Sequence, residues 1–180
     1  KVVIILIIYW SNKCDFSPFL PLDKCIVIMG LEIERKFLVK NNTYLKYALS
    51  EIKIKQGYIS RNVDSTVRVR IKDNSAFLTI KTKNHGCLRH EYEYAIPTTD
   101  ALELISICDG LIIDKTRYIV PFEGFIWEID VFHGKLEGIV VAEIELSDTS
   151  QSFPLPPFIG EEVTGKPEYY NSNMHLLLTT

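Results

Sequence analysis

Alternation of apolar and polar residues dominates this chain and predicts β-strands. In residues 66–72, three apolar residues alternate with Arg68, Arg70 and Lys72. Successive side chains of a strand point to opposite faces, so this stretch would place apolar groups on one face and bases on the other. Comparable strand patterns cover residues 30–39, 52–60, 76–83, 89–96, 113–120, 125–132 and 140–146.

Short helical segments are predicted between these strands. Asn41, Asn42 and Thr43 offer caps for a helix ending near residue 49, and Thr98, Thr99 and Asp100 precede an amphipathic helix over 101–108. A last helix is expected at 167–178, while Pro and Ser break regular structure at 147–160. About eight strands joined mostly by short turns indicate a mainly β (α+β) fold, an antiparallel sheet with covering helices.

Charged residues gather on one face of nearly every predicted strand. Glu32, Glu34 and Lys36 lie about 7 Å apart along one strand face, where two carboxylates could share a divalent cation. A single row of this kind is more simply explained as a solvated strand face. The same pattern recurs, however, at Arg68, Arg70, Lys81, Arg89, Glu91, Glu93, Lys115, Arg117, Glu128, Asp130, Glu143 and Glu145.

The opposite faces of these strands are apolar, so helices should cover them. The charged faces could then point to bulk water from an open sheet, or line a water-filled interior if the sheet closes. Carboxylates this dense repel one another unless a divalent cation lies among them, and the bases favour a multiply charged anion. A metal-chelated polyphosphate would satisfy both requirements.

Composition narrows the alternatives. The 180 residues fit one domain, and the net charge of −3 gives no general attraction to nucleic acid or to an acidic membrane. Four cysteines without a Cys-x-x-Cys pair suit reduced thiols in a cytoplasmic protein. No Gly-rich nucleotide loop or Ser/His/Asp arrangement is present, and the four histidines lack ligand spacing.

Residues 1–28 differ from the rest of the chain. The apolar run from Val2 to Trp10 is too short to span a bilayer, and no Ala-x-Ala-like cleavage site follows it. Met29 and Gly30 lead directly into the first charged strand. We therefore expect 1–28 to be an N-terminal extension and 29–180 to be the functional domain.

The ordered set of charged strands resembles the CYTH superfamily, the triphosphate tunnel metalloenzymes, and in particular its short bacterial inorganic triphosphatase-like members. The motifs are Glu32-x-Glu34-x-Lys36, Arg68-Val69-Arg70, Lys81, Arg89-x-Glu91-x-Glu93, Lys115-Thr116-Arg117, Glu128-Ile129-Asp130 and Glu143-Ile144-Glu145. The resemblance implies a closed, eight-stranded antiparallel β-barrel tunnel. It also implies that triphosphates bind there with Mg²⁺ or Mn²⁺, with two ions expected, and that the last helix lines or plugs one tunnel mouth.

The resemblance also implies roles for individual residues. It makes Glu32, Glu34, Asp130, Glu143 and Glu145 metal ligands, and it makes Arg68, Arg70, Lys81 and Arg117 phosphate contacts. Arg89 and Lys115 are further substrate-binding candidates, and Glu91, Glu93 and Glu128 would orient the bases. Lys36, beside the catalytic candidates Glu32 and Glu34, would contact the phosphate chain or assist proton transfer. Simple charge balance in the tunnel wall is the alternative for each residue.

The function expected is metal-dependent hydrolysis of inorganic tripolyphosphate to pyrophosphate and phosphate. Adenylate cyclase and thiamine triphosphatase are the enzymatic alternatives, because Tyr58, Phe77, Tyr92 and Phe132 could stack an organic group if they are not core residues. A polyphosphate or nucleotide sensor is the non-catalytic alternative, although anion binding alone gains nothing from so many carboxylates. The sequence leaves open whether the protein is a monomer or a homodimer.

Overall fold

One antiparallel sheet makes up most of the protein. The computed structural model describes residues 25–26, 33–62, 64–83 and 91–178. Its ten strands are β1 (Cys25–Ile26), β2 (Ile33–Val39), β3 (Ser50–Asn62), β4 (Ser65–Lys72), β5 (Ser75–Thr82), β6 (Glu91–Ile96), β7 (Ile113–Phe122), β8 (Phe125–Phe132), β9 (Val140–Leu146) and β10 (Ile159–Glu162). The eight long strands therefore follow the alternating pattern of the sequence closely.

The helical segments are short. Only α1 (Thr98–Ser106) is α-helical among the described residues, while η1 (Asn42–Lys46), η2 (Gly134–Leu136), η3 (Pro167–Tyr169) and η4 (Met174–Leu178) are 3₁₀ segments. The Asn41 side chain accepts a hydrogen bond from the Thr43 amide and caps η1 as expected. The predicted cap of α1 is not confirmed, because Pro97 occupies the N-cap position. In the described residues, no helix has the length and apolar character needed to cross a membrane.

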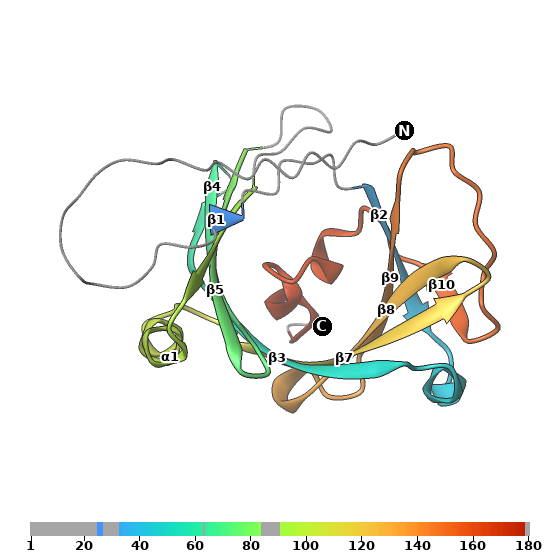
Figure 1. The fold of residues 1–180 in the computed structure, drawn as a ribbon, viewed down its shortest axis with the longest axis horizontal. Coiled ribbons are helices and arrows are strands. Elements are labelled where there is room, and N and C mark those ends of the chain that lie inside the picture. Colours follow the sequence, from blue (N-terminus) through green and yellow to red (C-terminus); the bar gives the residue numbers. More distant parts are fainter. Residues whose placement is uncertain (1–24, 27–32, 63, 84–90, 179–180) are drawn as a thin grey trace, which may run out of the picture.

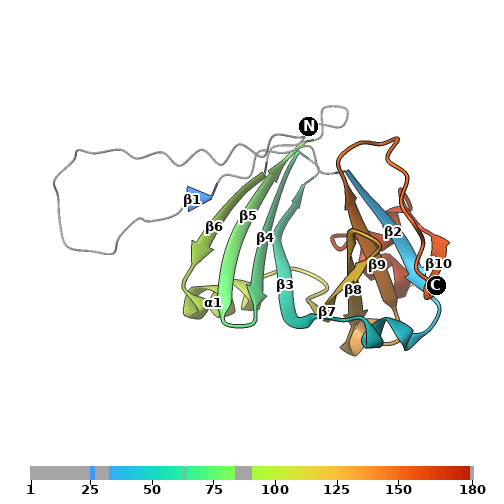
Figure 2. The ribbon, with the colours of Figure 1, turned by 45° about the vertical axis from the view of Figure 1, so that its right-hand side comes forward.

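The sheet curves into two arms (Figures 1 and 2), with strand order β1-β6-β5-β4-β3-β7-β8-β9-β2-β10. One arm carries β4, β5 and β6, and the other carries β8, β9 and β2. Strands β3 and β7 join the arms through the register Ile52–Arg117 and Ile54–Lys115. Two stretches far apart in the sequence are thereby brought to face each other across the concave side.

The expected closed barrel is not confirmed. Closure would require hydrogen bonds between the outer strands of the two arms. Instead, the outer long strand of each arm pairs with a short strand. Strand β10 pairs with β2, and β1 pairs with β6, so no described pairing joins the two ends of the sheet. Covering an edge with a short strand satisfies its backbone groups without closure.

The convex face of the sheet holds two apolar cores. Helix α1 covers β4 and β5, where Ala101 and Ile105 pack with Val69 and Ala76. On the other arm, Trp127, Ile129 and Ile144 form a second core that is covered by Tyr44, Phe158 and Phe153. The alternation of the sequence explains this packing, because these apolar residues alternate with the charged residues along the strands and therefore point to the opposite face. The cover is only partly helical, since much of it comes from the irregular segment before β10.

The C-terminal segment lies on the concave side, between the two arms (Figure 1). Met174 of η4 is fully buried and packs with Ile113, Phe132 and Val141, which are inward-facing residues of β7, β8 and β9. The predicted single helix over 167–178 is instead two 3₁₀ turns. Its position agrees with the expected segment at one end of the charged interior.

Candidate functional site

The inner face is the concave side of the sheet, and it collects the predicted charged rows of β2 and of β4 to β9. The pairing register places Lys36 opposite Glu143 on β9, and Glu143 opposite Glu128 on β8. It likewise places Arg117 opposite Asp130. On the other arm, Gln56 lies opposite Arg70, Thr66 opposite Lys81, and Thr79 opposite Glu93. The prediction that the charged rows share one face is therefore confirmed within the described residues.

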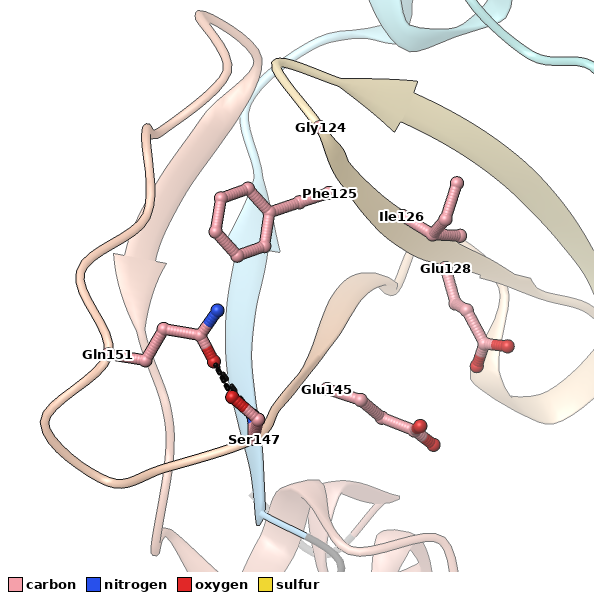
Figure 3. A pocket seen from close by; sticks show the side chains of 7 residues that line it. All are labelled: Gly124, Phe125, Ile126, Glu128, Glu145, Ser147 and Gln151. Carbon is pink, nitrogen blue, oxygen red and sulfur yellow. Dashed lines mark hydrogen bonds between the residues drawn. The ribbon is translucent and has the colours of Figure 1, made fainter. Parts of the chain in front are cut away.

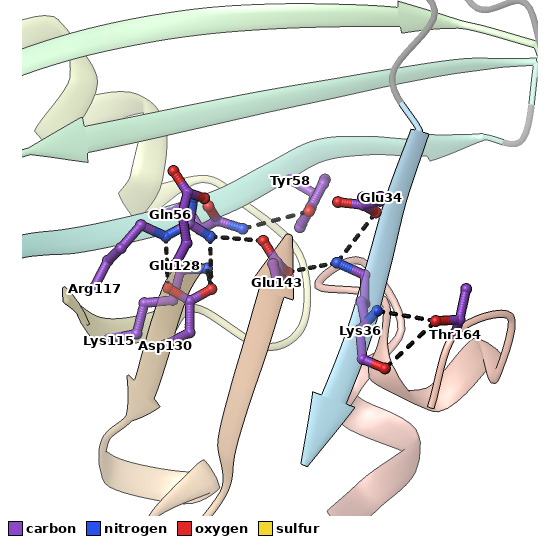
Figure 4. A network of polar contacts seen from close by, with 10 residues as sticks. All are labelled: Glu34, Lys36, Gln56, Tyr58, Lys115, Arg117, Glu128, Asp130, Glu143 and Thr164. Atoms are coloured by element: carbon purple, nitrogen blue, oxygen red, sulfur yellow. Dashed lines mark hydrogen bonds and ion pairs between the residues drawn. The ribbon is translucent and has the colours of Figure 1, made fainter. Parts of the chain in front are cut away.

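An ion-pair network, formed by Lys36, Lys115, Arg117, Asp130 and Glu143, occupies the β2, β7, β8 and β9 half of this face (Figure 4). Arg117 is its centre. Its Nε donates to Asp130 Oδ1 at 2.6 Å, and its Nη2 donates to Asp130 Oδ2 at 2.7 Å and to Glu143 Oε2 at 2.9 Å. Its Nη1 donates to Glu128, and the Lys115 amine donates to Asp130. One guanidinium thus joins three carboxylates.

Lys36 connects the network to β2. Its Nζ lies 2.5 Å from Glu143 Oε1 and 3.1 Å from Glu34 Oε1. Its backbone is held from the segment after β10, because its amide donates to Thr164 Oγ1 at 2.9 Å and its carbonyl accepts from the Val163 amide at 2.8 Å. Both backbone groups of the residue that carries the amine are therefore held by residues 163–164.

Electrostatics in the network favours charged forms. Burial lowers the pKa of Lys36, but the carboxylates of Glu143 and Glu34 outweigh this and raise it above its ordinary value. Burial raises the pKa of Glu143, yet Lys36, Arg117 and Lys115 bring it well below its ordinary range. Lys115 is the exception: it is 0% exposed, and burial lowers its pKa to about 8 despite Asp130. Lys36 therefore remains a cation and is poorly suited to act as a base.

Two bases of the opposite arm are held by carboxylates of β6. Lys81 Nζ lies 2.6 Å from Glu91, and Arg68 Nη2 lies 3.6 Å from Glu91 and 3.5 Å from Glu93. Thr79 accepts a hydrogen bond from Arg68 at 3.1 Å and donates to Glu93 at 2.9 Å. Glu91 and Glu93 therefore contact two of the bases, and their role in orienting these bases for a substrate stays a prediction.

Arg68, Arg70 and Lys72 form a basic cluster on β4, in which Arg70 and Lys72 have no such carboxylate partner among the described contacts. No carboxylate of the described residues forms an ion pair with Arg70; its Nε donates to the neutral Gln56 Oε1 at 2.9 Å. Burial, Arg68 and Arg117 lower the pKa of Arg70 to about 10. Burial and the charge of Arg70 likewise lower the pKa of Lys72. The cluster repels itself and would be stabilised by a bound anion.

Two of the predicted metal ligands, Glu34 and Glu145, are directly opposite each other on β2 and β9. The Glu34 side chain is 33% exposed, and Glu145 is exposed. Glu145 and Glu128 also line an open pocket of about 430 Å³ together with Phe125, Ile126, Ser147 and Gln151 (Figure 3). We call the surface formed by Glu34, Glu128 and Glu145 the acidic wall; solvent and ions can reach it.

The carboxylates do not form a preassembled metal cage. The part of the chain that the structure describes contains no group of three His, Cys, Asp or Glu residues arranged to hold an ion. Asp130 is fully buried, and both of its oxygens accept from Lys115 and Arg117. The adjacent Glu34 and Glu145 supply hard oxygen donors, whose chemistry suits a divalent cation that takes its other ligands from substrate and water.

Two predicted site residues cannot be placed, and one residue of the site, Gln56, was not predicted from the sequence. Glu32 and Arg89 lie outside the described residues. Gln56 is fully buried in the site, and its Nε2 donates to the Tyr58 hydroxyl at 3.4 Å (Figure 4). One signal could have revealed Gln56: it follows Ile52 and Ile54 at the period of two, so a lone amide enters an otherwise apolar row.

Comparison with known proteins agrees with this arrangement. A family model, the CYTH domain, matches residues 30–173. This chain belongs to the CYTH family. It is 46% identical over 147 residues to an inorganic triphosphatase of Acetivibrio thermocellus, covering 81% of this chain and 94% of the relative. It is 37% identical over 149 residues to an inorganic triphosphatase of Nitrosomonas europaea, covering 81% and 97%.

A solved CYTH-like structure shares the fold. The crystal structure of an inorganic triphosphatase superposes with a TM-score of 0.66 at 33% identity, covering 82% of this chain and 96% of that one. The resemblance stated from the motifs alone is thus confirmed at the level of the family. The roles of the individual CYTH residues stay predictions.

Proposed function

We propose that this protein is a metal-dependent inorganic triphosphatase that hydrolyses tripolyphosphate to pyrophosphate and phosphate. The observation that supports this most is the unequal charge of the two arms. The basic cluster lies on the concave side of one arm, and Glu34 and Glu145 lie side by side on the concave side of the other. A multiply charged anion carrying a divalent cation complements both walls at once. The two named relatives support the choice of substrate.

The basic cluster would bind the phosphate chain. Arginine matches phosphate oxygens with two parallel hydrogen bonds, while lysine acts as a point charge. Arg68 and Arg70 are therefore assigned to phosphate oxygens, and Lys72 and Lys81 to the remaining charge of the chain. Thr79, Gln56 and Glu91 hold Arg68, Arg70 and Lys81 respectively, so these three bases have little order to gain on binding.

The acidic wall would hold the cation. Glu34 and Glu145 are the proposed ligands among the described residues, with Mg²⁺ or Mn²⁺ as the ions and Glu32 as a further candidate. A cation held there would neutralise phosphate charge and supply a more acidic water, whose oxygen would end on the terminal phosphorus while the bridging oxygen leaves with pyrophosphate. Attack breaks one P–O–P bond and releases phosphate and pyrophosphate.

Lys36 would act as a fixed cation. Its raised pKa excludes it as the proton acceptor at neutral pH, and its amine lies between the acidic wall and the network. It is therefore placed to stabilise negative charge as it develops in the transition state. Glu143, Asp130 and Glu128 hold Lys36, Lys115 and Arg117 in position, although a direct metal contact of Asp130 or Glu143 remains a prediction.

A substrate panel tests the proposal. Phosphate release should be measured from tripolyphosphate, ATP, thiamine triphosphate and pyrophosphate with Mg²⁺ or Mn²⁺, with and without a chelator, together with cyclic AMP formation. We expect kcat/KM for tripolyphosphate to be at least about tenfold higher than kcat/KM for each of the other three compounds. Turnover of tripolyphosphate should vanish with the chelator. Binding without turnover would identify a sensor, and cyclic AMP would identify a cyclase. A cytoplasmic location and the oligomeric state stay predictions.

A further inference from the structure

Gln56 is the partner of Arg70 where a carboxylate would ordinarily be expected. It lies in the middle of β3, directly between Arg70 on β4 and Ile113 on β7. Its side chain is fully buried, and Arg70 is 9% exposed. A buried guanidinium is usually paired with an acid, because removing a charge from water is costly. Here the amide oxygen accepts from Nε at 2.9 Å instead.

The amide holds the guanidinium without cancelling its charge. Among the described contacts, none engages the Nη1 and Nη2 groups of Arg70, so the fork that suits a phosphate is left available. Arg117 provides the contrast within the same interior: three carboxylates take its donors, and its charge is neutralised. The amide nitrogen Nε2 of Gln56 donates to the Tyr58 hydroxyl at 3.4 Å, which fixes the direction in which the amide oxygen points.

We propose that Gln56 is a positioning residue that orients Arg70 toward the triphosphate while leaving its full positive charge to the substrate. This inference rests on the proposed function, because it assumes that the anion of the site is a triphosphate. Gln56 does not touch the substrate in this proposal; it acts through Arg70. A glutamate of the same shape at position 56 would hold the guanidinium equally well but would neutralise it.

A double-mutant cycle tests this. Binding of sodium tripolyphosphate is measured by calorimetry in the wild type, Gln56→Glu, Arg70→Ala and the double variant. We expect Gln56→Glu to weaken binding at least about tenfold in the wild-type background and less than about twofold in the Arg70→Ala background. Asn62→Asp is the matched control, since it makes the same amide-to-acid change at the exposed end of β3.

The outcomes separate this role from a structural one. Equal weakening in both backgrounds, or no weakening at all, would overturn the proposal, because Gln56 would then not act through Arg70. If Gln56→Glu does not fold, Gln56→Leu replaces it, since leucine removes the hydrogen-bond acceptor without adding charge. We expect Gln56→Leu to weaken tripolyphosphate binding about threefold in the wild-type background and to have no effect in the Arg70→Ala background. If the wild type binds tripolyphosphate but does not hydrolyse it, the proposed function fails while this cycle still decides the role of Gln56.

When the wild type turns over, kinetics add an independent readout. A neutralised Arg70 should raise KM for tripolyphosphate by the same factor as the binding constant and leave kcat within about threefold. A merely structural defect would instead lower the fraction of active protein and reduce kcat at an unchanged KM. The second pattern in folded Gln56→Glu would contradict the proposal.

Discussion

Arg70 and Arg117 are two inward-facing arginines of the same interior, and their surroundings are opposite. Arg117 is bonded to Asp130, Glu128 and Glu143, and despite burial these carboxylates raise its pKa well above the ordinary value. Arg70 is bonded to Gln56, and burial together with two neighbouring arginines lowers its pKa to about 10. The charge of Arg117 is thus satisfied by carboxylates of the protein, while Arg70 retains its charge for a ligand.

This difference separates stability from binding. When a buried charge has all its partners, removing one member of the group is destabilising, because the remaining buried charges are left uncompensated. A buried charge without an acidic partner costs stability in the free protein and recovers it when an anion binds. Loss of Arg117 should therefore cost the free protein far more stability than loss of Arg70.

The largest expected effect is on stability. Arg117→Met should lower the free energy of unfolding by about 3–5 kcal/mol, because three buried or half-buried carboxylates lose their common partner. Arg70→Met should change it by less than about 1 kcal/mol, since it removes a repelled charge and keeps most of the side-chain volume. Urea denaturation without substrate measures both. Equal losses in the two variants would contradict the contrast between Arg70 and Arg117.

The acidic wall gives the next prediction. Glu145→Gln keeps the shape of the side chain but removes a hard anionic ligand, so turnover should fall about a hundredfold, on the order of 3 kcal/mol. Raised Mg²⁺ or Mn²⁺ should recover part of the loss. Glu103→Gln on the exposed face of α1 is the control and should be unchanged. Near-wild-type activity of Glu145→Gln at low metal would support charge balance as its only role.

Ligand-induced stabilisation sharpens the assignment of Arg70. At a tripolyphosphate concentration a hundred times the dissociation constant, the wild type should gain about 2.7 kcal/mol of stability. Arg70→Met should gain much less at the same concentration, because its binding site has lost a principal contact. Thermal unfolding with and without tripolyphosphate measures the gain. A full gain in Arg70→Met would remove Arg70 from the site.

The smallest expected effect is a pH dependence that arises from the network. The pKa of Glu143 lies well below the unfolded value of 4.5, so the folded state binds fewer protons there than the unfolded state. Its contribution to stability is therefore complete above pH 4.5 and is lost as pH falls below it, on the order of 1–2 kcal/mol. Urea denaturation of metal-free protein between pH 6 and pH 3 measures this. Glu143→Gln should have a lower free energy of unfolding at pH 6 than the wild type, and this free energy should fall less between pH 6 and pH 3.

Much of this protein could be predicted from the sequence. Residues 66–72 alternate so regularly that the strand, its two faces and its bases could be named, because the side-chain period of a strand is a local property. The eight long strands, the shared charged face and the CYTH family followed from the same local pattern. The division of residues 167–178 into two 3₁₀ turns did not follow from that pattern, because this segment packs through Met174 against strands that are distant in the sequence.

Only the tertiary structure decided which charges cancel. Arg68, Arg70 and Arg117 look alike in the sequence, each two residues from another base, yet the register brings Arg117 opposite Asp130 and Arg70 opposite Gln56. The open ends of the sheet were decided in the same way, by the pairing of β10 with β2 and of β1 with β6. Charge compensation and edge pairing depend on which strands become neighbours, and that is set by contacts between residues far apart in the chain.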